Sequence, residues 1–138
     1  MKLRELRIIH AAMLGGTVLY TLLAAFLVFT GVISVGTGGL PIPMQYAGAA
    51  ILLLMFAGVF LRRHLVGQIS LDDPPEVRAP AYANAVIIGA ALPEGGGPLL
   101  ITLGIITSSA TWILAGGLSA AFLMWQGRPT PEEAGLEP

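Results

Sequence analysis

Hydrophobic residues gather into four long runs, separated by short stretches that are polar or rich in glycine and proline. The runs span residues 8–29, 44–61, 81–106 and 110–125. A transmembrane helix needs roughly 17–25 predominantly apolar residues, and the second and fourth runs lie at the short end of that range. We therefore predict an all-α membrane protein with four transmembrane helices.

The third run is the longest and contains Pro93 and Pro98. Each proline removes a backbone donor and its ring clashes with the preceding turn of a helix. We therefore expect the third helix to be long enough to tilt, and to bend near these prolines.

Composition supports a membrane protein and excludes several kinds of chemistry. The chain has 138 residues, of which 55% are hydrophobic and 11% charged, whereas soluble domains average about 25% charged residues. It contains no cysteine, which excludes disulfides and cysteine metal sites. We recognise no catalytic constellation, no metal-binding cluster and no basic tract for nucleic acid, and we expect no cofactor.

The basic residues indicate which side of the membrane each connection occupies. They precede the first run, lie between the second and third, and follow the fourth: Lys2, Arg4, Arg7, Arg62, Arg63, Arg78 and Arg128. The other two connections, 30–43 and 107–109, carry no charge. By the positive-inside rule, both termini and the middle loop are cytoplasmic, as in a multi-pass protein of the plasma (inner) membrane.

These runs divide the chain into a transmembrane domain at 1–127 and a short tail at 128–138. The first run is longer than the apolar part of a signal peptide, so we expect it to be retained. We expect a cytoplasmic loop at 62–80, whose Arg62, Arg63 and Arg78 contact lipid headgroups or a cytoplasmic partner. The tail is acidic and proline-rich, and we expect it to be disordered.

The chain contains an internal repeat. Residues 8–16 align without a gap with residues 87–95, with five of the nine positions identical. Both segments would run outward from the cytoplasm, which predicts two tandem hairpins in parallel, at about 8–61 and 81–125. Gly15 takes the place of Glu94 in this alignment, so the first hairpin lacks the carboxylate.

Glu94 is the main candidate for a functional residue, because residues 79–127 carry no other charge. An ionised carboxylate inside a bilayer costs several kcal/mol, on the order of 3 or more, unless it is protonated, paired or used. Pro93 precedes it and Gly95, Gly96 and Gly97 follow, which weakens the helix locally and lets another helix approach. Two readings stay open: an exchangeable proton, or a buried acid with a structural partner.

The segment Ala-Ala-Leu-Pro-Glu at 90–94 resembles the carboxylate helix of proteolipid (c or K) subunits of rotary F-, V- and A-type ATPases. The order of helix, polar cytoplasmic loop and carboxylate helix is similar too. The sequence departs from the family pattern directly after Glu94, where Gly-Gly-Gly-Pro-Leu stands. The resemblance implies proton binding at Glu94, a site shaped by Pro93, Gly15 and the three glycines, and a homo-oligomer or other membrane subunits as partners.

Three functions follow from these observations. The first is a proteolipid-like subunit of a larger complex, such as a proton-translocating ATPase; the others are a non-catalytic scaffold or accessory subunit and a small oligomeric proton-coupled transporter. The fourth run contains small residues at helical spacing, which pack either within the bundle or at an oligomer face. These are Gly116, Gly117, Ala120 and Ala121. We expect His10 to lie at the membrane interface, where a proton relay with Glu94 requires matching depths.

Overall fold

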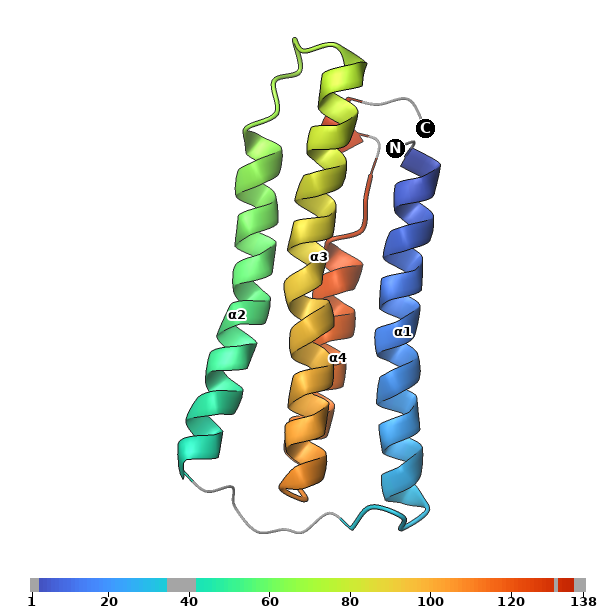
Figure 1. Ribbon diagram of the computed structural model, residues 1–138, viewed down its shortest axis with the longest axis vertical. Helices are drawn as coiled ribbons and strands as arrows, with labels where there is room; N and C mark the ends of the chain where they lie inside the picture. Colours follow the sequence, from blue (N-terminus) through green and yellow to red (C-terminus); the bar gives the residue numbers. More distant parts are fainter. Residues whose placement is uncertain (1–2, 35–41, 131, 136–138) are drawn as a thin grey trace.

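The computed structural model describes residues 3–34, 42–130 and 132–135, which form four α-helices and one short 3-10 helix (Figure 1). The all-α class with four helices is therefore confirmed. The elements are α1 (Leu3–Phe29), α2 (Ile42–Gly67), α3 (Pro75–Ile106), α4 (Ala110–Gln126) and η1 (Glu132–Ala134).

Three of the helices, α1, α2 and α3, are long and apolar enough to cross a membrane. This agrees with the prediction of a membrane protein. The remaining helix, α4, has 17 residues and is about 26 Å long at 1.5 Å per residue. That length is slightly short of a bilayer core of about 30 Å, so a fourth crossing stays a prediction.

The helices alternate in direction, so α1 begins, α4 ends and α2 connects to α3 at the same end of the bundle (Figure 1). That end carries every charged residue of the described chain except Glu94. We call it the basic end, because all six described arginines lie there: Arg4, Arg7, Arg62, Arg63, Arg78 and Arg128. The described residues of the opposite end are uncharged.

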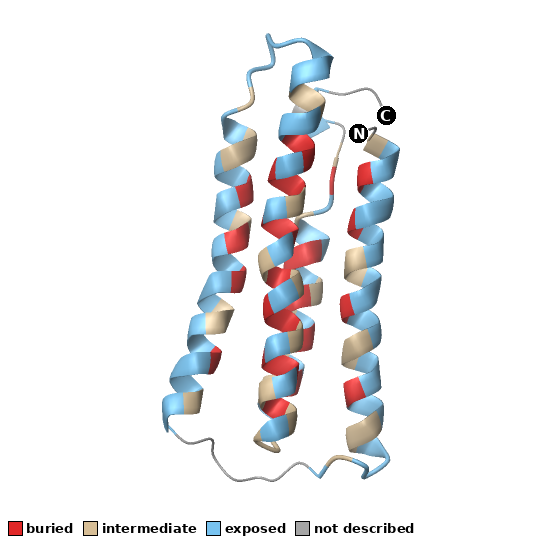
Figure 2. Ribbon diagram, viewed as in Figure 1, coloured by how far each residue is buried: buried red, intermediate tan, exposed pale blue. Residues whose placement is uncertain are grey.

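The helices α3 and α4 pack closely in the centre, and α1 and α2 flank them on opposite sides (Figure 1). Burial concentrates on α3 and on narrow inward stripes of α1 and α2 (Figure 2). Large apolar side chains such as Leu19, Phe26 and Leu53 cover the outer faces, as expected where lipid is the solvent. The two predicted hairpins, α1 with α2 and α3 with α4, are therefore packed differently. Only α3 and α4 lie against each other as a tight hairpin.

Small residues bring α3 and α4 into close contact. A Cβ added to Gly116 would lie 2.7 Å from the Gly97 carbonyl oxygen, and one added to Gly97 would lie 2.5 Å from the Ala120 Cβ. On the neighbouring face of α4, Gly117 packs against Thr21 of α1. Gly116, Gly117 and Ala120 therefore make contacts within the bundle, while Ala121 is half-buried.

The helices extend further at the basic end than the sequence indicated. The expected loop at 62–80 is shorter, because α2 continues to Gly67 and α3 already begins at Pro75. Proline is well suited to a first helical position, since its fixed φ and missing N–H cost nothing there. Pro93 and Pro98 lie inside α3 without ending it; each leaves the carbonyl four residues earlier without a helical donor.

Candidate functional site

Glu94 lies on α3 at the edge of the bundle, half-buried, and within the described residues its carboxylate makes no hydrogen bond or ion pair. Its neighbours differ in their packing. Pro93 is buried, and Gly96 and Gly97 pack against Met55 of α2 and Ala120 of α4. Gly95 is exposed and has no atom within 4 Å of its Cβ position. The carboxylate therefore stands next to open space on one side and to tight packing on the other.

The level of Glu94 along the bundle follows from the contacts between α1 and α3, which run parallel. Thr17 Cγ2 lies 3.7 Å from the Cβ position of Gly97, and the hydroxyls of Tyr20 and Thr102 are 3.2 Å apart. Each pair has nearly the same separation in sequence as Gly15 and Glu94, so Gly15 lies level with the carboxylate. Gly15 itself is exposed with nothing within 4 Å. It shares the level of Glu94 but lies on the outer face of α1.

Contacts between α2 and α3 show how far Glu94 lies from the arginines of the basic end. Arg62 packs against Gly89, whose added Cβ would lie 2.5 Å from the Arg62 Cβ. Glu94 follows Gly89 by about 8 Å along the helix; α3 begins about 28 Å before Glu94 and ends about 18 Å after it. Its level, that of Gly15, is close to the centre of α1, and the mid-membrane position that we expect for Glu94 from the sequence stays a prediction. The carboxylate is therefore within two turns of polar groups.

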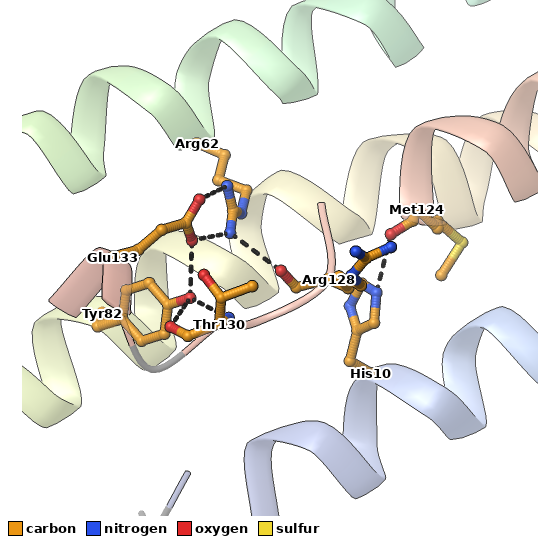
Figure 3. A network of polar contacts seen from close by, with 7 residues as sticks. All are labelled: His10, Arg62, Tyr82, Met124, Arg128, Thr130 and Glu133. Carbon is orange, nitrogen blue, oxygen red and sulfur yellow. Dashed lines mark hydrogen bonds and ion pairs between the residues drawn. The ribbon is translucent and has the colours of Figure 1, made fainter. Parts of the chain in front are cut away.

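These polar groups form a network at the basic end (Figure 3). The Arg62 side chain is only 7% exposed, and its Nη2 lies 2.5 Å from Oε2 of Glu133 in η1. Arg62 also donates to the backbone carbonyl of Arg128, at 3.4 Å. The hydroxyl of Tyr82 donates to Glu133 at 2.8 Å and accepts from the N–H of Thr130 at 2.9 Å. The described part of the tail, which we expected to be disordered, thus folds back onto α2 and α3.

Glu133 is held in its ionised form by these contacts. Burial acts to raise the pKa of Glu133, but the hydrogen bonds from Arg62 and Tyr82 and the charge of Arg62 outweigh it and lower the pKa below its ordinary value. Arg62 is consequently neutralised inside the protein. Of the three arginines that we expected to meet headgroups or a partner, Arg62 is buried, Arg78 is half-buried and Arg63 is exposed.

His10 connects α1 to α4 beside this network. Its Nε2 lies 2.9 Å from the carbonyl oxygen of Met124, a group in the last turn of α4 that lacks a helical donor. The His10 Nδ1 and the Arg62 Nε are buried without a partner in the described chain, and both residues line a cavity of about 30 Å³. A cavity of that size can hold a water that bridges them. Ala90 also lines it, one turn before Glu94 on the same helix face.

Sequence reasoning did not identify Tyr82, Thr130 and Glu133 as partners of Arg62. The opposite charges of the acidic tail and the basic 62–63 segment were the available signal, but charge alone does not pair individual residues. The described residues contain no group of three or more metal-binding side chains. The candidate site therefore consists of Glu94, with the polar cavity one turn away.

The chain was compared with protein-family models, curated proteins and solved structures. No protein-family model, no curated protein and no solved structure matches this chain.

Proposed function

We propose that this chain is a proteolipid-like integral membrane subunit that binds a proton at Glu94 and contributes to proton translocation in a larger complex. The observation that carries the proposal is the half-buried Glu94 carboxylate, which has no partner in the described chain and lies on an otherwise uncharged stretch of α3. A neutral carboxyl is tolerated beside lipid or a neighbouring subunit. An ionised one requires a cation or water.

The backbone around Glu94 supports a proton-binding role. Pro93 leaves the Gly89 carbonyl without a helical donor, and Pro98 does the same for the carbonyl of Glu94 itself. These oxygens can accept hydrogen bonds from a water or a protonated acid nearby. The open surface at Gly95 leaves room for a proton donor from outside the chain.

The polar cavity supports a direction for proton entry. It lies on the basic-end side of Glu94, and two of its lining residues, His10 and Arg62, each have a buried nitrogen without a partner among the described residues. A water there would stand one helical turn from Glu94, between the carboxylate and the arginines. Proton entry from the basic end follows from this arrangement.

The proposal includes an orientation in the membrane. The basic end faces the cytoplasm with both termini and the 68–74 connection, and α4 crosses the plasma membrane as a fourth span. Location of all described arginines at one end supports this orientation. The equal level of Gly15 and Glu94 supports the tandem repeat, with one carboxylate in two hairpins. The proposal extends to assembly of several copies of the chain into a ring.

A second candidate function is a scaffold subunit in which Glu94 is not exchanged. It is favoured by Gly15 and Gly16 on α1, which are exposed with no atom within 4 Å of their Cβ positions. A helix of another subunit could approach this bare surface closely. In that case α1, rather than Glu94, would carry the essential contact.

Covalent labelling by a hydrophobic carbodiimide distinguishes the two functions. The reagent reacts with protonated carboxyls, so we expect the purified protein to be labelled at Glu94 and more slowly at high pH. Glu94→Gln should abolish labelling, and Glu132→Gln, which changes an exposed tail acid, should leave it intact. Absence of labelling in the folded wild-type protein would refute proton binding. A mass of the detergent-extracted particle equal to a single chain would exclude a ring.

A further inference from the structure

A groove of about 370 Å³ runs between α1 and the end of α4 at the basic end. Arg7 and Arg128 belong to its lining, and its apolar lining residues are Ala11, Leu14, Trp125 and Pro129. We call it the α1–α4 groove. Its cationic side chains lie next to its apolar lining residues. Both are at the level where the apolar part of α1 and α4 meets the charged residues of the basic end.

The positive charge of this groove is not neutralised within the described chain. Arg7 and Arg128 are both exposed, and no acidic side chain of the described residues lines the groove. Glu133, which lines a neighbouring groove together with Arg128, is engaged by Arg62 and Tyr82. The Arg128 guanidinium is oriented by stacking 4.8 Å from the Trp125 ring centroid. Two guanidinium groups are therefore free to bind an anion.

A second groove at the same end provides an internal contrast. It has about the same volume, 380 Å³, and lies between α2 and α3. Asp73 lines it together with Arg78, so its one cation is balanced by an acid. The two grooves are similar in volume and lie at the same end of the bundle. Of the two, the α1–α4 groove has more cationic than acidic lining residues.

We propose that the α1–α4 groove binds an anionic phospholipid, with the phosphate between Arg7 and Arg128 and the first acyl methylenes against Ala11, Leu14 and Trp125. Guanidinium groups bind phosphate oxygens through two hydrogen bonds, and tryptophan is favoured at the headgroup level of a bilayer. A lipid is the occupant that supplies both an anion and an apolar chain in this order. The proposal is independent of proton binding at Glu94.

The test uses the fluorescence of Trp125. The chain has two tryptophans, so Trp112→Phe leaves Trp125 as the only one in the full-length protein. This protein is reconstituted into equimolar phosphatidylcholine and phosphatidylglycerol, with bromine near the glycerol end of the acyl chains of one lipid or the other. Because both vesicles have the same surface charge, any difference in quenching reports which lipid occupies the site.

We expect the brominated phosphatidylglycerol to quench Trp125 with an occupancy about fivefold higher, in line with the gain per basic residue near an anionic surface. Arg7→Gln should remove most of this preference. Arg4→Gln removes the same charge one turn away, outside the groove lining, and should retain it. Helix content of each variant is checked by circular dichroism.

Three results would overturn the proposal. Equal quenching by the two brominated lipids would show that the groove does not select an anion. A preference that survives Arg7→Gln would place the lipid elsewhere. Equal loss in Arg4→Gln and Arg7→Gln would assign the preference to general surface charge.

Discussion

The surroundings of Glu94 on α3 and of Glu133 in the tail differ in almost every respect that matters to a carboxylate. Glu133 accepts hydrogen bonds from Arg62 and Tyr82 and is partly open to solvent. Glu94 lies on an uncharged stretch and has no partner in the described chain. One acid is fixed in a single charge state by its neighbours, whereas the other can change its charge without breaking an internal contact.

The largest expected effect is the complete loss of carbodiimide labelling when Glu94, but not Glu133, is exchanged for its amide. Glu94→Gln should abolish carbodiimide labelling while the thermal unfolding midpoint in detergent stays unchanged, because no internal contact is lost. Glu133→Gln should show the opposite: full labelling, with stability reduced by about 1 kcal/mol, typical of a partly exposed pair. A much lower unfolding midpoint for Glu94→Gln would show that Glu94 has a structural partner. The contrast between Glu94 and Glu133 would then be wrong.

Removal of the cation tests how much the network contributes to stability. Arg62→Leu should lower the free energy of unfolding by about 2 kcal/mol, below the usual cost of breaking a fully buried pair because Glu133 is partly exposed. Arg63→Leu is the matched control, since Arg63 is exposed on the same helix turn. Equal effects of the two changes would mean that the ion pair contributes nothing specific.

Acidification should weaken the attachment of the tail. Because the folded-state pKa of Glu133 is lowered, its contribution is complete above the unfolded value, about 4.3. That contribution is lost as the pH falls through the folded pKa. The unfolding midpoint of the wild-type protein should therefore fall toward that of Glu133→Gln in acid, and the two should differ most near neutral pH. A constant difference at all pH values would contradict this origin.

The smallest expected effect concerns the Tyr82 hydroxyl. Tyr82→Phe keeps the ring, which is 0% exposed, and removes the hydrogen bonds to Glu133 and Thr130. We expect a loss of about 0.5 kcal/mol in a thermal or denaturant titration. In the Glu133→Gln background the loss should be smaller, and full additivity would show that the two residues act independently.

The sequence predicted the helices well where apolar residues end at an uncharged connection. The first run was expected to end at Phe29 and the third at Ile106, where α1 and α3 end. Prediction failed at the basic end, where α2 passes Arg62 and Arg63 and ends at Gly67. Arginine forms helices readily and its stem packs on apolar surface, so charge alone does not mark a helix end.

The candidate site was predictable only in part. Glu94 was visible in the sequence because it is alone among apolar residues. Its lack of a partner and its position within two helical turns of Arg62 depend on which helices pack together, which hydropathy does not reveal. Burial of Arg62 was equally hidden, since its partner is 71 residues away in the chain. Arginine is rarely buried unless it is paired, so neither residue alone predicts the ion pair.

The Arg62–Glu133 pair also imposes an order on biosynthesis. Arg62 is made 71 residues before Glu133, and α3 and α4 must be synthesised in the interval. Throughout that time the guanidinium has to remain with water or lipid phosphate. The pair can close only when the ribosome has passed the last helix, so Arg62 becomes buried as a late step. A nascent chain stopped before residue 132 would contain all four helices while Arg62 still lacked its ion-pair partner.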